Sequence, residues 1–218
     1  MLETDPDKVE FKDGRFRSDT SQRSFDVFEI ARAAQTLNDL EDDLRGPLSA
    51  ESDQHFTDGG YPYGCAVCEV EIEPDTGAVE IVRYSAVDDV GRAVNPMILH
   101  GQTHGAIAQG VGQALWEQCY VDHDSGQPLV GSLMDYGVPR ADTVPPFVTE
   151  IAEVLSPTNP LGIKAGGEGG TTGAPAVVVS AIVDALRDYG VRDIKMPATP
   201  YNVWRAINDA KTANGKDA

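Results

Sequence analysis

Residues 162–175 read Gly162-Ile163-Lys164-Ala165-Gly166-Gly167-Glu168-Gly169-Gly170-Thr171-Thr172-Gly173-Ala174-Pro175, and an apolar run follows from 176 to 186. Several glycines surround one carboxylate, that of Glu168. Glycine is favoured where the backbone takes positive φ or a ligand approaches closely, and its ordering costs conformational entropy, so such a cluster needs a compensating reason. The stretch predicts a functional loop followed by a helix that holds Pro175 in its first turn.

Two phosphate-binding motifs can be compared with this sequence. Gly162 and Gly167 have the separation of a Walker A motif, but Glu168 and Gly169 stand where that motif requires Lys and then Ser or Thr, and an acid would repel phosphate. No G-x-G-x-x-G sequence opens a helix after a strand in the loop, so a dinucleotide fingerprint is excluded as well. Two interpretations stay open: Glu168 is a displayed reactive carboxylate, or it is a solvated residue of an ordinary surface loop.

The composition bounds the function. The 218 residues contain 17 Lys and Arg against 35 Asp and Glu, a net charge of -18. Such acidity argues against nucleic acid or an anionic membrane as a partner. No apolar run approaches the roughly 20 residues of a membrane span, and the N-terminal sequence lacks the order of a signal peptide. We expect a cytoplasmic protein without a membrane span.

The order of elements predicts two parts. Residues 1–60 contain a hairpin around Asp13 and Gly14, a helix that Ser24 can cap, and an acidic irregular connection. Residues 61–218 form the second part and carry all of the chemistry that the sequence suggests. Its first elements are two strands of a hairpin, from about 64 to 84, joined by a turn at 73–77.

Cysteine usage does not indicate a redox site. Cys65 and Cys68 have C-x-x-C spacing, but they fall in an alternating strand, where residues three apart point to opposite faces. A structural role is therefore favoured over a redox or zinc pair. Cys119 stands alone in the sequence.

The later elements follow in order. Residues 87–96 are expected to form a loop that carries the adjacent acids Asp88 and Asp89, and the Asn95-Pro96 pair begins a helix over roughly 96–117. A strand is expected over 147–154, a helix over 176–188, and a last amphipathic helix from about residue 202.

The helix at 96–117 carries a strip of small residues and a row of amides. The strip consists of Gly101, Gly105, Ala108 and Gly112, and the amides are Gln102, Gln109 and Gln113. Glycine inside a helix costs about 0.5–1 kcal/mol relative to Ala, so the strip predicts close packing against a ligand or against another backbone. Amides donate and accept together, which suits a heterocycle.

A metal site is not predicted on this helix. His100 and His104 are spaced i, i+4, but the Glu of H-E-x-x-H is missing and no third ligand stands out. The sequence therefore predicts no metal held by protein side chains.

In this order the segments resemble one family. The chain is similar to the C-terminal part of the large, molybdenum-binding subunit of the xanthine dehydrogenase, aldehyde oxidase and aerobic carbon monoxide dehydrogenase family. The segments that carry the resemblance are residues 64–77, 87–96, 101–112 and 164–168. The resemblance implies an α+β fold of the molybdopterin-binding type, with a mixed sheet covered on one face by helices.

The resemblance also implies an activity. Family members are hydroxylases in which a molybdenum centre held by a pyranopterin transfers oxygen from water to an aldehyde, an N-heterocycle or a related small substrate. Glu168 matches the catalytic glutamate, which acts as the general base. The positions that match the cofactor-binding segments are Gln102, Gly105, Gln109, Gly110, Gly112, Lys164, Ala165, Gly166 and Gly167. A non-catalytic assembly or cofactor-insertion protein on the same domain is the alternative.

The departures from the family concern length. Family subunits are several times longer, so this chain is expected to be a separately encoded subunit of a split enzyme or a fragment, and to need the remainder of the molybdenum subunit as a partner. An iron-sulfur subunit and, in some members, an FAD subunit would carry those groups. The insertion at 169–173 is more like carbon monoxide dehydrogenase and isoquinoline oxidoreductase, which implies a cytosine dinucleotide cofactor. The sequence does not identify the substrate.

Overall fold

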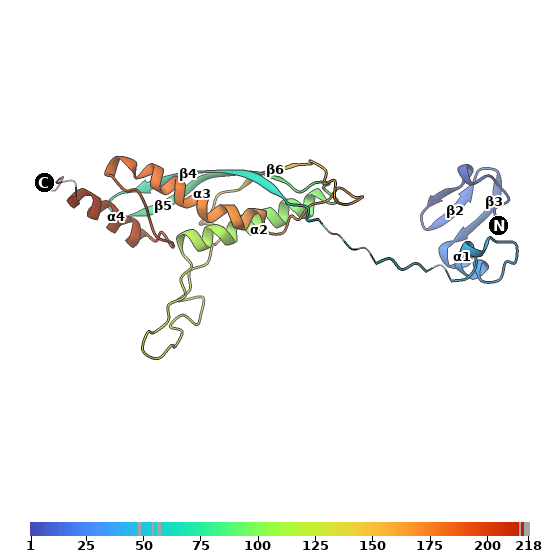
Figure 1. Cartoon of the computed structure of the whole chain (residues 1–218), viewed down its shortest axis with the longest axis horizontal. Coiled ribbons are helices and arrows are strands. Elements are labelled where there is room, and N and C mark those ends of the chain that lie inside the picture. Colours follow the sequence, from blue (N-terminus) through green and yellow to red (C-terminus); the bar gives the residue numbers. More distant parts are fainter. Residues whose placement is uncertain (48, 54, 56–57, 214, 216–218) are drawn as a thin grey trace. The chain divides into compact units, whose positions relative to one another are not determined.

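The computed structural model describes residues 1–47, 49–53, 55, 58–213 and 215. The chain divides into two compact units, Met1–His55 and Phe56–Ala218. Each unit contains a three-stranded sheet (Figure 1). No described helix has the length and apolar character needed to cross a membrane.

The first unit is a small antiparallel sheet followed by one helix. Its elements are η1 (Pro6–Lys8), β1 (Glu10–Lys12), β2 (Arg15–Ser18), β3 (Ser21–Asp26), α1 (Val27–Ala34) and η2 (Asp42–Leu44). The predicted hairpin is confirmed, with Phe11 opposite Phe16 and their rings 4.6 Å apart. Asp13 and Gly14 both take positive φ at its turn, as a tight hairpin turn requires.

The prediction that Ser24 caps the first helix was wrong. Residues through Asp26 continue as β3, and α1 begins at Val27 with Asp26 as its N-cap. Asp26 Oδ1 accepts a bond from the Glu29 backbone N–H, and Glu29 Oε2 accepts one from the Asp26 N–H. This capping box satisfies two orphan donors together. The Ser24 hydroxyl instead accepts a bond from Arg15 on the neighbouring strand.

The second unit is built on a mixed sheet with the order β4-β5-β6. β4 (Tyr63–Glu73) and β5 (Ala78–Asp89) form the predicted hairpin, and β6 (Val148–Ala152) runs parallel to β5. Alternate residues of β4 and β5 face a common core, as the period of two predicts. Cys65 is exposed and Cys68 half-buried, so the two thiols point to opposite faces.

Helices complete the core on one face of this sheet (Figure 1). They are α2 (Pro96–Leu115), α3 (Gly169–Ala185) and α4 (Pro200–Ala213), with a short η3 (Arg187–Tyr189) after α3. The core joins side chains from β5 and all three helices: Ile81, Tyr84, Ala86, Ile107, Val111, Leu115, Val178, Ile182, Val203 and Ile207. The predicted α+β class, with a mixed sheet and helices packed on one face, is confirmed.

Two predicted boundaries were wrong at places that matter for the site. β5 does not end before the two acids but continues through Asp89, because residues 85–89 pair with β4 on one side and β6 on the other. α3 begins at Gly169, seven residues before the predicted start, so Pro175 lies inside the helix and not in its first turn. Tertiary contact overrides the low helix propensity of this glycine run.

That contact is with α2. A Cβ added to Gly170 would lie 2.8 Å from the Thr103 carbonyl oxygen and 2.9 Å from the Ala106 Cβ. From the other side, a Cβ added to Gly110 would lie 2.7 Å from the Ala174 Cβ. Neither position has room for a side chain, so these glycines let the two helices touch.

A buried ion pair joins the glycine loop to β5. Lys164 Nζ lies 2.5 Å from Asp89 Oδ2, and its ammonium also lies 4.7 Å from the centre of the Tyr63 ring. Asp89 accepts further bonds from the backbone N–H groups of Gly91 and Val154. Burial opposes ionisation of Asp89, but these donors outweigh it and lower its pKa from 3.8 to about 2. Lys164 and Asp89 thus fix where the loop leaves the sheet.

The helix contact predicts opposite effects at two glycines of α3. Gly170→Ala should lower the free energy of unfolding by about 1–3 kcal/mol, because the added methyl group meets the α2 backbone. Gly173→Ala should raise it by about 0.5–1 kcal/mol, because alanine favours a helix and a Cβ at Gly173 meets no described atom within 4 Å. Denaturant unfolding of both variants measures the difference, and equal effects would contradict the packing role of Gly170.

The ion pair predicts a pH dependence of stability. Because the pKa of Asp89 is lower in the folded chain, its carboxylate stabilises the fold above about pH 4, and this contribution is lost as the pH falls toward 2. Asp89→Asn should be less stable than the wild type near neutral pH, and the gap should narrow between about pH 4 and 2. Denaturant unfolding across this range is the measurement; a gap that stays constant would rule out the Asp89 carboxylate as its source.

Candidate functional site

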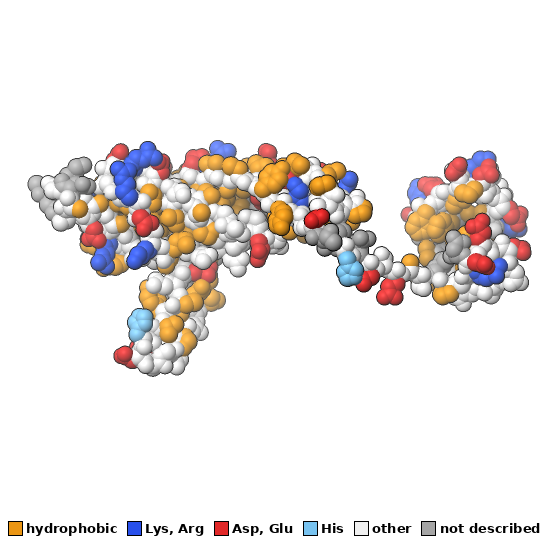
Figure 2. All heavy atoms as spheres, viewed as in Figure 1, with side chains coloured by type: hydrophobic (Ala, Val, Ile, Leu, Met, Phe, Trp, Pro, Cys, Tyr) orange, Lys and Arg blue, Asp and Glu red, His pale blue; other side chains and the backbone are white. Residues whose placement is uncertain are grey.

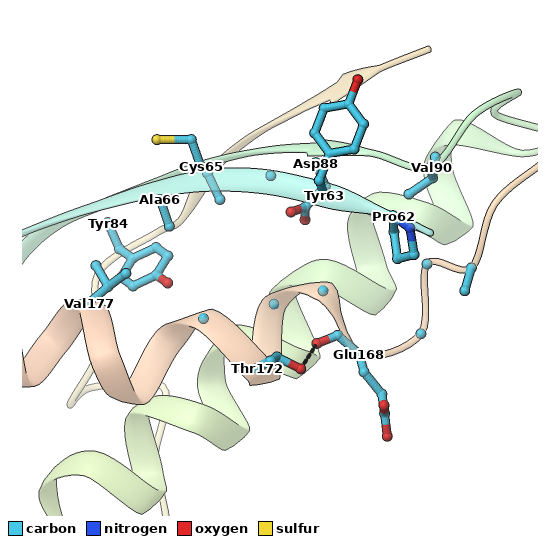
Figure 3. Close-up of a pocket in the computed structure, with 18 residues that line it drawn as sticks. Pro62, Tyr63, Cys65, Ala66, Tyr84, Asp88, Val90, Glu168, Thr172 and Val177 are labelled. Atoms are coloured by element: carbon cyan, nitrogen blue, oxygen red, sulfur yellow. Dashed lines mark hydrogen bonds between the residues drawn. The ribbon is translucent and has the colours of Figure 1, made fainter. Parts of the chain in front are cut away.

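The glycine loop and the start of α3 border a cleft beneath β4 (Figure 3). Its volume is about 660 Å³, and β4, β5 and α3 each contribute to its walls. Most of the lining is apolar or glycine: Pro62, Tyr63, Gly64, Cys65, Ala66, Tyr84, Ala86, Val90, Ala165, Gly166, Gly167, Gly169, Gly170, Gly173 and Val177. Asp88, Glu168 and Thr172 complete it.

Asp88 brings a carboxylate into this cleft. Its side chain points from β5 toward α3 (Figure 3), and Oδ2 lies 3.5 Å from the Thr103 hydroxyl, a long hydrogen bond. A Cβ added to Gly169 would lie 3.5 Å from the carboxyl group, so Asp88 borders the first residue of α3. Burial raises its pKa, and the bond from Thr103 lowers it by less. The carboxyl group is therefore poorly solvated and weakly satisfied.

Glu168 stands at the N-cap position of α3 with a fixed backbone and a free side chain. Its carbonyl oxygen accepts bonds of 3.0 Å from both the backbone N–H and the hydroxyl of Thr172. The side chain is exposed and points away from β4 and β5 (Figure 3). No group in the described part of the chain donates to its carboxylate. The backbone of Glu168 is therefore held in place, while its carboxylate remains open to an external ligand.

Amide side chains of α2 reach the same region. Gln102 Nε2 donates to the Gly167 carbonyl oxygen at 2.8 Å, and Gln109 Oε1 lies 3.3 Å from the Thr171 hydroxyl, which donates to it. Gly105 is exposed on α2 between these two glutamines, and a Cβ built there would meet no described atom within 4 Å. The structure thus brings Gln102, Gly105 and Gln109 together with the end of the glycine loop.

The other predicted cofactor residues lie differently. Gly110 is buried against α3, and a Cβ on Gly112 would lie 2.7 Å from Pro139, so both have a packing reason within the chain. Lys164 is engaged with Asp89. Ala165 lines the cleft. A Cβ on Gly166 would lie 3.2 Å from Val90, while one on Gly167 would meet nothing within 4 Å.

The histidine pair of α2 is satisfied by a hydroxyl group. His100 Nδ1 and His104 Nε2 lie 2.8 and 2.9 Å from the Thr149 hydroxyl on β6. Within the described residues, no group of three or more His, Cys, Asp and Glu side chains is placed to hold a metal ion. The pair therefore joins α2 to β6.

Asp88 is the polar residue of the cleft that the sequence analysis missed as a site residue. The signal was present, since two adjacent acids at the end of a strand must point to opposite faces. Because residues 87–96 were expected to form a loop, strand alternation was not applied to Asp88 and Asp89. Once β5 is seen to reach Asp89, alternation assigns Asp88 to the helix-covered face and Asp89 to the ion pair.

Comparison with known proteins gives the family. A family model described as molybdopterin cofactor-binding domain matches residues 1–145, a range that enters both units. The 6-hydroxypseudooxynicotine dehydrogenase complex subunit gamma of Paenarthrobacter nicotinovorans is 39% identical over 94% of this chain and 26% of its own length. The carbon monoxide dehydrogenase large chain of Hydrogenophaga pseudoflava is 36% identical over 70% of this chain and 19% of its own.

Solved structures agree. The crystal structure of quinoline 2-oxidoreductase from Pseudomonas putida 86 matches with a TM-score of 0.78 and 33% identity, over 95% of this chain and 27% of that one. The Cu,Mo-CO dehydrogenase structure matches with a TM-score of 0.77 and 28% identity, over 96% of this chain and 26% of that one. The chain therefore spans about a fifth to a quarter of the length of these proteins. It belongs to the molybdopterin cofactor-binding family that includes the large chains of carbon monoxide dehydrogenase and the molybdenum-binding subunits of xanthine dehydrogenase.

Proposed function

We propose that this chain forms one side of a molybdopterin-molybdenum site in an oxidoreductase that hydroxylates an aldehyde or an N-heterocycle, or oxidises a related small substrate, with water as the oxygen source. Glu168 is the general base in this proposal. One contrast supports the proposal. The backbone carbonyl groups of Gly167 and Glu168 are both hydrogen-bonded within the chain, whereas the Glu168 carboxylate is open to an external group.

Open glycines support a fit to the cofactor. Gly101, Gly105 and Gly167 have ordinary φ values, and a Cβ built on any of them would meet no described atom within 4 Å. The chain's own packing therefore gives no reason for glycine at these positions. A flat external group lying against them would, because each missing side chain lets it approach the backbone.

The neighbouring amides suit a pterin ring. Gln102 and Gln109 lie on either side of Gly105 and offer both donors and acceptors. The Gly167 carbonyl oxygen is already held by Gln102, so Gln102 would orient the loop as well as the cofactor. Gly110 would act through its packing against α3, Gly112 through its packing against Pro139, and Lys164 through its bond to Asp89.

Each of this chain's residues then has a defined part. When bound, the molybdenum group would supply the two-electron redox chemistry of the hydroxylation. Glu168 would accept a proton from the oxygen nucleophile, a step for which a positioned base contributes typically 10²- to 10⁴-fold. The bonds from Thr172 and Gln102 would keep its backbone fixed during this transfer.

The names of two relatives favour the heterocycle class of substrate. One is named for 6-hydroxypseudooxynicotine and another for quinoline, and both names denote molecules with a ring nitrogen. We carry over only the class, since the chain covers about a quarter of each relative.

The remaining parts of the enzyme are proposed from the same family. We infer that the rest of the molybdenum subunit supplies the other side of the cofactor site, and that iron-sulfur clusters and, where present, FAD lie on further chains. We propose the cytosine dinucleotide form of the cofactor because of the glycine- and threonine-rich segment after Glu168. This segment forms the first turns of α3.

A substitution at Glu168 tests the base. Glu168→Gln keeps the size of the side chain and removes its basicity, so the enzyme should keep its molybdenum while turnover falls by at least about 10²-fold. Screening aldehydes and N-heterocycles identifies a substrate; rapid-mixing reduction by that substrate and metal analysis are then done on the same preparation. Reduction at the wild-type rate in a metal-replete variant would remove Glu168 from the mechanism.

A substitution at Gly105 tests the cofactor surface. A Cβ at residue 105 meets no described atom of the chain within 4 Å, so the fold should tolerate Gly105→Leu, but the added side chain would occupy the space that we assign to the pterin. We expect molybdenum content to fall at least about tenfold, because overlap with a bound group is not relieved within a rigid helix. Gly131→Leu, also at an open position, is the control and should retain its molybdenum; equal metal content in both variants would contradict the assignment.

A further inference from the structure

β4 is an edge strand whose two halves differ. Among the described residues it pairs only with β5, so one side of its 11-residue backbone has no strand partner. The second half carries Glu69, Glu71 and Glu73, all exposed, and a register irregularity at Glu69 and Val70. Charges and bulges protect an edge from further strands. The first half, residues 63–68, has neither.

Apolar side chains surround the unprotected half. Tyr61 and Tyr63 are 81% and 60% exposed, and Val67 is 58% exposed. Figure 2 shows hydrophobic side chains gathered at this end of the second unit. Contiguous exposed apolar surface of this kind marks an interaction site.

The cleft lies directly under the same half of the strand. Residues 62–66 form one wall, and α3 forms the opposite wall (Figure 3). The cleft is open to the outside of the unit, and its volume of about 660 Å³ lies within the range of pockets that bind external groups. The space is suited to apolar side chains that this chain does not itself supply.

Asp88 adds a polar requirement. Within the described chain its carboxyl group has only the long bond from Thr103, and Gly64 and Gly169 border it without side chains. A group that fills the cleft would bury Asp88 further, so it must also offer a donor or a positive charge.

We propose that the unprotected half of β4 and the cleft beneath it receive an extended segment of the same molybdenum subunit, from sequence outside these 218 residues. The segment pairs its backbone with residues 63–68, places apolar side chains in the cleft and directs one donor to Asp88. This mode adds a strand to an open edge and takes its specificity from pockets for alternate side chains. The matched Cu,Mo-CO dehydrogenase chain, of which this chain covers 26%, has ample length for such a segment.

Other occupants fit less well. A second copy of β4 could pair along the edge, but its apolar residues Ala66, Cys68, Val70 and Ile72 already pack on its own core, so they could not fill the cleft. A small ligand could enter the cleft but would leave the backbone of residues 63–68 without partners. An extended segment of chain would both pair with the backbone of residues 63–68 and fill the cleft.

The test is hydrogen exchange on the molybdenum-containing enzyme that carries this chain. The two halves of β4 provide an internal comparison: amides of residues 63–68 should exchange at least about tenfold more slowly than those of 69–73. Equal exchange in the two halves would overturn the proposal. Concentration-dependent protection that accompanies self-association would also overturn it and would favour the second copy.

Two matched valine variants separate the edge from the sheet face. Val67→Lys places a charge on the unprotected edge, while Val82→Lys places it at an exposed valine of β5, the middle strand. The first should speed exchange of residues 63–68 at least about tenfold and the second should not. If neither or both do so, the edge is not the docking site.

The inference rests on the proposed function only in taking these residues as part of a larger molybdenum subunit. Metal analysis of the same preparations distinguishes a failure of the docking proposal from a failure of the proposed function. An enzyme without molybdenum would contradict the proposed function, whereas a molybdenum-loaded enzyme with an unprotected edge at residues 63–68 would contradict the docking segment alone.

Discussion

The close approach of α2 to α3 is the constraint on which the rest of the second unit depends. Gly110 and Gly170 let the two backbones meet where any side chain would collide. This contact turns a glycine-rich stretch into the first turns of a helix, although its intrinsic propensity opposes a helix. It also sets Gln102 beside Gly167, so the amides of α2 and the carboxylate before α3 belong to one surface.

Two neighbouring acids at the end of β5 serve different purposes because strand alternation separates them. Asp89 accepts hydrogen bonds from the Lys164 ammonium group and from two backbone N–H groups, and so fixes where the glycine loop begins. Asp88 points the other way, into a cleft where its carboxylate has one long bond among the described residues. A buried charge that is fully bonded stabilises a position, whereas a poorly bonded one favours a further partner.

The candidate site likewise contains some groups that are bonded within the chain and others that are open to an external partner. Groups that fix geometry, such as the Thr172 hydroxyl and the Gln102 amide, are bonded within the chain. Other positions are open to an external group: a Cβ on Gly105 or Gly167 would meet no described atom within 4 Å, and no described group donates to the Glu168 carboxylate. An arrangement of this kind fits a domain that forms one wall of a site, because the chain holds its own loop in place and leaves the facing surface open.

Local patterns in the sequence were enough for several elements. The turn chemistry of Asp13-Gly14 and of residues 73–77, the alternation of β4, and the Asn95-Pro96 start of α2 depend on contacts between near neighbours, and each prediction was confirmed. Periodicity also placed β6 and the last helix to within a few residues. The segments at residues 64–77, 87–96, 101–112 and 164–168 together led to the family, which the comparisons confirmed.

By itself, then, the sequence determined the family, the α+β class, the short-range turns and the Asn95-Pro96 start of α2, because these are set by residue type and by spacing along the chain. Tertiary structure alone decided that α3 begins at Gly169, that β5 extends to Asp89, and that Asp88 faces a cleft while Asp89 meets Lys164. The physical reason is that each of these outcomes depends on a neighbour distant in sequence: α2 stabilises a poor helix start, β6 extends a strand, and a lysine 75 residues away compensates a buried charge.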